Sequence, residues 1–179
     1  MEFITEYKGR EPGIIDLFTT TFTASEGEEE GALIGELVRN LLRGTGEKDL
    51  FVFTAEEDGM IIGGIVFSRL SYEKDERTVF VLAPVAVAPE QQGRGIGQKL
   101  LNHGLAALRS AGIDIAVTYG DPNYYAKVGF IPISEAGAPA PFPLNHPEGW
   151  LAQSLTNRAM APLKGPSRCV DALNDPAFW

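Results

Sequence analysis

The stretch PEQQGRGIGQKLL, residues 89–101, places three glycines within five positions and then runs directly into leucines at helical spacing. Each glycine inside a helix costs about 1 kcal/mol relative to alanine, so helix propensity does not explain the cluster. The apolar residues 78–87 precede it, which predicts the order strand, turn, helix. A glycine-rich turn that opens a helix exposes backbone N–H groups beside the positive end of the helix dipole. The stretch therefore predicts an anion site, with phosphate as its natural ligand.

Two familiar phosphate-binding signatures are excluded by the spacing. The dinucleotide fingerprint needs glycines separated by two and then three positions, whereas Gly93, Gly95 and Gly97 are separated by two and two. The P-loop needs Gly-Lys followed by Ser or Thr, and here Gln98 follows Gly97. The turn is therefore of another kind.

Two helices are predicted before residue 45. The first carries Pro12 in its first turn, where a missing N–H has no cost. Apolar residues at spacings of three and four predict the buried faces of the two helices: Ile14, Leu17, Phe18 and Phe22, then Leu33, Ile34, Leu37, Val38, Leu41 and Leu42. Gly44 is a suitable stop for the second helix.

Strands are predicted at residues 3–7, 50–56, 60–68 and 78–87. Glu57, Asp58 and Gly59 are typical of a hairpin turn and residues 72–77 of a polar loop, so the last three strands form a meander. Pro84 lies inside the last of them, where it cannot donate a ladder hydrogen bond. We expect the neighbouring strand to be absent, bulged or splayed away at that proline.

The region after the turn continues with a helix that ends at Ala111-Gly112 and a strand at 113–118, which together form a βαβ unit with a parallel pair. The helix places these residues inward: Ile96, Leu100, Leu101, Leu105 and Leu108, with Gln98, Lys99, Asn102, His103 and Arg109 outward. Asp121 as N-cap and Gly129 after the last turn predict a short helix at 122–128. A Pro-rich loop to about residue 147 then precedes a last strand.

Composition and charge bound the function. The chain has 179 residues, 44% of them apolar, which suits one domain spanning residues 1–179. Its net charge of −9 argues against a nucleic-acid partner. No apolar run has the length of a membrane span, and the first residues lack a secretory signal. The single cysteine, Cys169, agrees with a reducing compartment, so we expect a cytoplasmic protein without membrane contact.

Two separated motifs resemble the GNAT superfamily of N-acetyltransferases. Gln92, Gly95 and Gly97 match the family's Gln-x-x-Gly-x-Gly loop, which follows a strand and holds coenzyme A pyrophosphate. About 30 residues later, GDPNYYAKVGF at 120–130 is similar to the family's Tyr-x-x-x-Gly-Phe element at Tyr125, Gly129 and Phe130. The resemblance covers most of the chain. It implies a mixed α/β fold of three layers, with helices on both faces of a central mixed sheet that contains the meander and the βαβ unit.

The resemblance implies an enzyme that transfers an acetyl group from acetyl-CoA, the co-substrate, to a primary amine of a small molecule or peptide. Tyr125 is the expected general acid, since a phenol is protonated at neutral pH and can donate to the leaving thiolate. The residues implied in cofactor binding are Val85, Val87, Gln92, Gly93, Arg94, Gly95, Ile96 and Gly97. A homodimer is compatible with the family. A non-catalytic acyl-CoA-binding or sensor module, and transfer of a longer acyl chain, stay open as alternatives.

The remaining candidates are few. Glu26, near the junction of the first two helices, and Tyr124, beside Tyr125, are candidates for substrate binding, and the general base is not identified. His103 is expected to be solvated, whereas His146 is a candidate for the pocket edge. Two distant histidines and one cysteine lack ligand spacing, so no metal is expected.

Overall fold

The computed structural model describes residues 1–179, which divide into two compact units. The first unit is Met1–Phe67 with Pro84–Gly104, and the second is Ser68–Ala83 with Leu105–Trp179. Two strands and one helix, β3 (Met60–Arg69), β5 (Val79–Val87) and α3 (Ile96–Ser110), contribute residues to both units. The extent of a single domain over 1–179 stays a prediction.

The chain forms one mixed sheet and one small sheet. Hydrogen-bonded strands follow the order β1-β2-β3-β5-β6-β8-β7, and β4 pairs with β9 separately. The bounds of the other elements are β1 (Glu2–Ile4), α1 (Glu11–Glu26), α2 (Glu28–Gly44), β2 (Leu50–Glu57), β4 (Ser71–Tyr72), β6 (Ile115–Tyr119), α4 (Pro122–Ala126), β7 (Ile131–Pro132), β8 (Trp150–Ser154) and β9 (Ser167–Arg168). Short 3-10 turns lie at Glu47–Asp49, Pro89–Gln91, Pro147–Gly149, Asp171–Leu173 and Pro176–Phe178. The mixed α/β class predicted from the sequence is confirmed.

The antiparallel meander forms as predicted. β2 and β3 join through Asp58 and Gly59, which both have positive φ, 52° and 78°, as a two-residue type I′ hairpin turn requires. On its other side β3 is hydrogen-bonded to β5, and the Ala88 N–H, just after β5, donates to the Ile62 carbonyl at 2.9 Å. β1 completes this part of the sheet by antiparallel pairing with β2.

Helices cover both faces of the sheet in the first unit. Successive strand residues face opposite sides, so Gly63 and Gly64 of β3 face different layers. A β-carbon at Gly63 would lie 3.4 Å from Leu100 of α3, and one at Gly64 would lie 3.0 Å from Phe18 of α1. The three-layer arrangement is therefore present in this unit.

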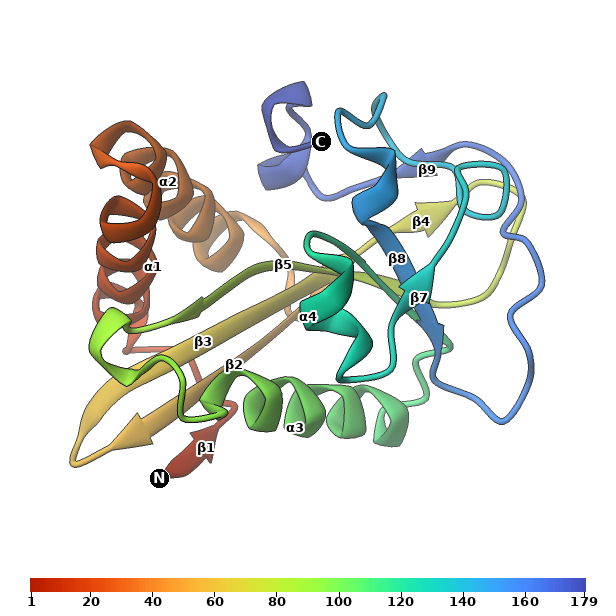
Figure 1. Ribbon diagram of the computed structural model, residues 1–179. Helices are drawn as coiled ribbons and strands as arrows, with labels where there is room; N and C mark the ends of the chain where they lie inside the picture. The colour runs from red at the N-terminus through yellow and green to blue at the C-terminus, as the bar shows by residue number, and fades with distance from the viewer. The chain divides into compact units, whose positions relative to one another are not determined.

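Helices α1 and α2 lie side by side (Figure 1) and approach closely through small residues. A β-carbon at Gly31 would overlap Thr23 Oγ1 and lie 2.8 Å from the Thr19 carbonyl oxygen. The expected apolar face of α2 is buried with one exception, Leu33, whose exposed fraction is 37%. Leu33 lies about 100° around the helix from buried Ile34, on the side turned away from α1, so its predicted burial was wrong.

The second unit contains the predicted parallel pair. β5 and β6 pair in parallel from Val79–Ile115 to Leu82–Thr118, with α3 as the crossover, and β8 pairs antiparallel with β6. β4 was missed inside the predicted loop and β7 inside the Pro-rich segment, because a two-residue strand carries no alternation of its own. α4 ends at Ala126, two residues earlier than predicted, because the Val128 N–H bonds to the Tyr125 carbonyl three residues back.

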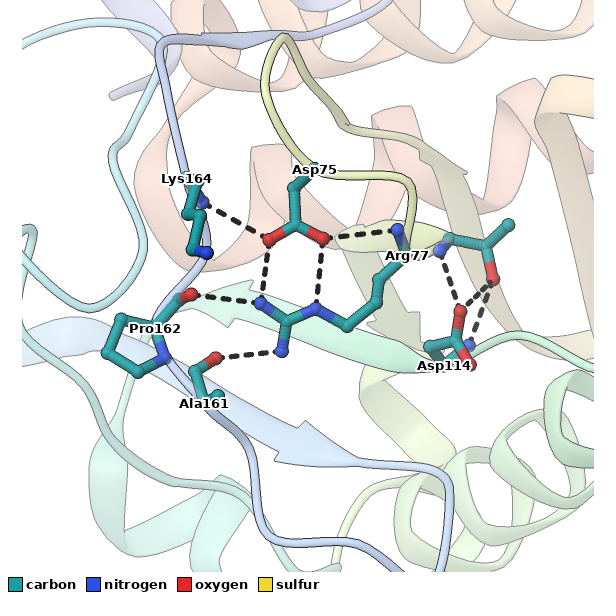
Figure 2. Close-up of polar contacts among 7 residues, drawn as sticks. Asp75, Arg77, Asp114, Ala161, Pro162 and Lys164 are labelled. Atoms are coloured by element: carbon teal, nitrogen blue, oxygen red, sulfur yellow. Dashed lines mark hydrogen bonds and ion pairs between the residues drawn. The ribbon is translucent and has the colours of Figure 1, made fainter.

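A bidentate ion pair ties the β4–β5 loop to the C-terminal segment (Figure 2). Arg77 donates to both oxygens of Asp75, at 2.9 and 2.7 Å, and to the carbonyls of Ala161 and Pro162 at 2.8 and 2.9 Å. The Lys164 N–H also donates to Asp75. These bonds, led by those from Arg77, lower the pKa of Asp75 from 3.8 to about 2.

Asp75→Asn tests this ion pair. A lowered folded-state pKa stabilises the fold above pH 4, and the contribution is lost as the pH falls through about 2. We expect the variant to lose about 2 kcal/mol of unfolding free energy at pH 7, and less toward pH 2, in urea titrations. Asp16→Asn, at an exposed position of α1, is the control and should match the wild type. A loss independent of pH would contradict this account.

Gly31→Ala tests the close approach of α1 and α2. The added carbon forces the helices apart, so we expect a loss of about 1–3 kcal/mol of unfolding free energy by chemical denaturation. Gly44→Ala in the same helix adds a carbon in open space and should be neutral or stabilising by up to about 1 kcal/mol. Equal effects of the two substitutions would show that helix propensity, not packing, decides both.

Candidate functional site

The glycine turn follows β5 and the 3-10 turn Pro89–Gln91 in the first unit. Gly93 and Gly95 have φ of 79° and 73°, in the left-handed region that side chains disfavour. A β-carbon at either position would meet nothing within 4 Å, and Gln92 to Gly95 are exposed. The two glycines are thus required by the backbone conformation, and the space beside them is open to a ligand.

The first turn of α3 supplies the polar groups of the site. The first bond at the start of α3 joins the Lys99 N–H to the Gly95 carbonyl at 3.1 Å. The amides of Ile96, Gly97 and Gln98 therefore lie in the turn where a helix provides no acceptor. A helix of 15 residues adds the positive end of its dipole there, so this turn suits a phosphate group.

Gln92 has a structural role in the turn. Its side-chain Nε2 donates to the Val87 carbonyl at 3.0 Å, which fastens the turn to the last residue of β5. Val85 and Val87 are half-buried, whereas Pro84 before them and Ala86 between them are buried. The predicted loop is therefore hydrogen-bonded to the end of β5 through Gln92.

Arg94 is held by acidic and polar neighbours. Its guanidinium donates to both oxygens of Glu57 at 3.1 and 3.3 Å, and also to Gln91. These charge-assisted bonds from Arg94 lower the pKa of Glu57 and raise that of Arg94. Sequence reasoning missed Glu57 because its position beside Asp58 and Gly59 indicated only a hairpin turn.

The parallel register of β5 with β6 stops two residues before Pro84. The last pair is Leu82 with Thr118. A proline cannot donate to a ladder, so it is tolerated beyond that pair. The prediction of an absent, bulged or splayed neighbour at Pro84 named no particular strand; on the β6 side, the pairing is absent at that proline.

Tyr124 and Tyr125 lie on α4 in the second unit. Asp121 caps this helix by accepting from the Asn123 N–H at 2.9 Å, as predicted. The two half-buried rings meet edge to face with centroids 5.1 Å apart. Burial raises the pKa of Tyr124.

Tyr125 is held from several sides. Its ring packs edge to face on Phe130 at 5.8 Å, and a β-carbon at Gly120 would lie 2.8 Å from its Cε2. Burial raises the pKa of Tyr125 to about 12, while a side-chain hydrogen bond with Thr118 acts in the opposite direction. Gly120 therefore makes room for this ring, and the phenol stays protonated at neutral pH.

The C-terminal side of α4 is fixed by Gln153 of β8, which sequence reasoning missed. Its Nε2 donates to the Val128 carbonyl at 3.1 Å, and its Oε1 accepts from Arg109 at 3.2 Å. Gln153 is buried, so both bonds satisfy a polar group that burial would otherwise penalise. Nothing in a strand-like stretch of sequence distinguishes a glutamine of this kind.

The other candidates differ in outcome. Glu26 is the exposed last residue of α1, and its substrate role stays a prediction. His103 is half-buried between Phe3 and Phe53, at ring distances of 4.8 and 5.7 Å, so its predicted solvation was wrong. The amphipathic pattern did not reveal that β1 covers this side of α3.

His146 lines a cavity of about 370 Å³ in the second unit. The other residues of its wall are Tyr119, Gly120, Asp121, Pro122, Glu148 and Gly149. The His146 side chain is 77% exposed, with Nδ1 3.5 Å from Glu148.

Burial raises the pKa of Cys169, which makes this thiol a poor nucleophile.

Known proteins have sequences similar to this one. A family model described as acetyltransferase (GNAT) domain matches residues 48–132. The uncharacterized N-acetyltransferase YjhQ of Escherichia coli K12 is 36% identical over 141 residues, 76% of this chain and 77% of YjhQ. The uncharacterized N-acetyltransferase YhbS of the same strain is 30% identical over 119 residues, 66% of each chain.

Solved structures share the fold. The structure of YhbS from Escherichia coli in complex with CoA has a TM-score of 0.83 at 24% identity, covering 97% of this chain and 92% of that chain. A GNAT family acetyltransferase from Brucella melitensis in complex with acetyl-CoA has a TM-score of 0.76 at 28% identity, covering 97% of each chain. The chain therefore belongs to the GNAT family of N-acetyltransferases. None of its helices combines the length and apolar character that crossing a membrane requires.

Proposed function

We propose that the protein transfers an acetyl group from acetyl-CoA to a primary amine of a small molecule or peptide. The observation that carries the proposal is the glycine turn, where open space at Gly93 and Gly95 meets the free amides that begin α3. Bound acetyl-CoA supplies an activated thioester. Turnover with a panel of amines identifies the acyl acceptor.

The cofactor would be held by backbone more than by side chains. The amides from Gln92 to Gly97, with Val85 and Val87 at the end of β5, are the proposed contacts. Arg94 joins them by turning its guanidinium from Glu57 to a phosphate, which exchanges one anionic partner for another. Arg94 is exposed and Glu57 is half-buried, so the ion pair is partly solvated and this exchange has a small cost.

Tyr125 is the proposed acid for the leaving thiolate. Its pKa of about 12 keeps the proton on the phenol through the neutral range. Because an ordinary thiol has a pKa near 8.5, complete transfer to a thiolate is opposed, and the phenol acts first as a hydrogen-bond donor to the developing negative charge. The complete transfer needs a group that stabilises the phenolate.

The family's name supports an enzyme over a non-catalytic acyl-CoA-binding module. Both would bind acetyl-CoA, so binding does not separate them. Release of free CoA in the presence of a panel of amines, including polyamines, amino sugars and peptides, distinguishes an enzyme from a binding module. Turnover with any amine supports the enzyme, and binding without turnover over the whole panel supports the module.

Gly95→Glu tests the cofactor site. Acetyl-CoA at 100 times its dissociation constant should stabilise the wild type by about 2.7 kcal/mol, measured by thermal shift. A glutamate at this position adds bulk and negative charge where phosphate is proposed, so the shift should vanish. Gly9→Glu is the matched control, because Gly9 also has a positive φ, 81°, with nothing within 4 Å. It should keep the shift; a folded wild type without any shift would overturn the cofactor proposal.

Tyr125→Phe tests the acid. We expect kcat to fall about tenfold or more, since a lost proton donor typically costs that much, while acetyl-CoA affinity stays within twofold. Tyr7→Phe, which removes a phenol outside α4 and the glycine turn, should keep kcat within about twofold. The wild-type rate should show no loss from this group up to pH 10, because its pKa is about 12. Unchanged kcat in Tyr125→Phe would remove Tyr125 from the mechanism.

A further inference from the structure

The cavity that His146 lines in the second unit shares part of its wall with the proposed acid. Gly120, one of the wall residues, leaves the space for the Tyr125 ring, since a β-carbon there would lie 2.8 Å from Cε2 of that ring. Asp121, the next wall residue, accepts through its carbonyl from the Tyr125 N–H at 3.1 Å. The cavity therefore adjoins the residue proposed to protonate the leaving thiolate.

Backbone hydrogen bonds hold the wall of the cavity in place. The Gly120 N–H donates to the Gly149 carbonyl at 3.0 Å, and a β-carbon at Gly149 would lie 2.8 Å from the Gly120 carbonyl oxygen. The Gly149 N–H donates in turn to the His146 carbonyl at 2.9 Å. The volume of about 370 Å³ is at the small end of the range for small-molecule sites, so the cavity suits a small molecule rather than a folded protein.

Tyr119 gives the wall an aromatic ring in a fixed orientation. Its hydroxyl accepts from the His146 N–H at 2.6 Å, and its ring meets the buried Trp150 edge to face with centroids 6.3 Å apart. Trp150 is fixed as well, because its Nε1 donates to the Ala138 carbonyl at 2.9 Å. The face of a phenol ring attracts ammonium groups, since the ring quadrupole is negative there.

The charged side chains of the wall are mainly acidic. Asp121 and Glu148 contribute carboxylates, and no lysine or arginine lines the cavity. His146 adds an imidazole, whose Nδ1 lies 3.5 Å from Oε1 of Glu148. Oδ1 of Asp121 accepts from the Asn123 N–H at 2.9 Å in the helix cap, which leaves Oδ2 for another donor. A cavity with one aromatic ring and two carboxylates favours a cation over an anion.

The chemistry of acetyl transfer decides which part of an acceptor this cation is. The attacking nitrogen must be uncharged, because its lone pair forms the bond to the acetyl carbon. An ammonium group held between carboxylates has no lone pair, so it cannot be the nitrogen that attacks. A cation bound in this cavity is therefore a second group of the acceptor, which keeps its charge throughout the transfer.

We propose that the cavity binds the acyl acceptor and that the acceptor is a small amine with a second positively charged group, the class of aliphatic diamines and polyamines. The inference rests on the proposed function and deepens it by naming the substrate class. The charged group lies against Tyr119 and the two carboxylates, and the neutral amine at the other end of the chain attacks the thioester. An N–C bond forms and the C–S bond breaks, while the acceptor nitrogen loses one proton and the CoA sulfur gains one.

Two amines with the same carbon chain test the second charge. Putrescine has an amine at both ends and butylamine at one. We expect the wild type to have a kcat/KM for putrescine about tenfold above that for butylamine, as for two partly solvated ion pairs. Equal values for the two amines would overturn the proposal.

Carboxamide variants test the wall. Glu148→Gln and Asp121→Asn each remove one charge at nearly constant shape, and asparagine is also a good N-cap, so α4 should persist. In the double variant the preference for putrescine should fall to about twofold, the statistical advantage of two equivalent amines. Glu135→Gln, at an exposed position outside the cavity, is the matched control and should keep the wild-type preference. An unchanged preference in the folded double variant contradicts the assignment of this cavity.

A second measurement does not depend on turnover. In ¹⁵N–¹H correlation spectra, addition of putrescine should shift the amide signals of Gly120 and Gly149, and the double variant should reduce these shifts. Signals that stay unmoved in the wild type overturn the inference, whatever the rates.

The two readouts separate the inference from the proposed function. If the wild type acetylates amines without preferring putrescine to butylamine, the inference is wrong and the proposed function stands. If the wild type acetylates no amine, the proposed function fails, and the signals of Gly120 and Gly149 alone decide whether the cavity binds a diamine.

Discussion

The backbone amides in the first turn of α3 have no acceptor within their own helix, and this shortage organises the proposed site. β5 delivers the chain to that turn, two glycines with positive φ bend it, and Gln92 fastens it to Val87. Meanwhile the leucines of α3 are buried against the sheet, so the helix axis and its dipole are fixed. The proposed anion site gives a reason for three glycines that helix propensity alone disfavours.

A second constraint acts on the proposed acid. The ring of Tyr125 needs the space that Gly120 leaves, the cap that Asp121 provides and the neighbour Phe130. Burial holds its proton firmly, which makes the phenol a good hydrogen-bond donor and a reluctant acid.

The sequence predicted the parts of the fold that depend on long, regular patterns. The faces of α1 and α3, the hairpin at Asp58-Gly59 and the βαβ unit follow from periodicity and turn chemistry, and the structure confirms them except at Phe22, which is half-buried. β4 and β7 were missed because two residues carry no period. Leu33 and His103 were misjudged because apolar spacing does not say which flank of a helix another segment covers.

The candidate site was predictable to the same degree. Glycines leave a motif in the sequence, because a positive φ and an open approach restrict the residue type. Glu57 and Gln153 leave none: each is an ordinary residue for a strand or a hairpin, and its partner, Arg94 or Val128, is distant along the chain. Only their contacts in the folded structure reveal the roles of these residues.

The most direct test of the central claim is an ¹⁵N–¹H correlation spectrum of the protein with and without acetyl-CoA. We expect the amides of residues 93–98 to show the largest shifts and to gain protection from solvent exchange, because they would donate to the pyrophosphate. We also expect Gly95→Glu to abolish these changes. Binding of acetyl-CoA that leaves the amides of 93–98 unmoved while others shift would contradict the account, since the glycine turn would then be a turn without a ligand.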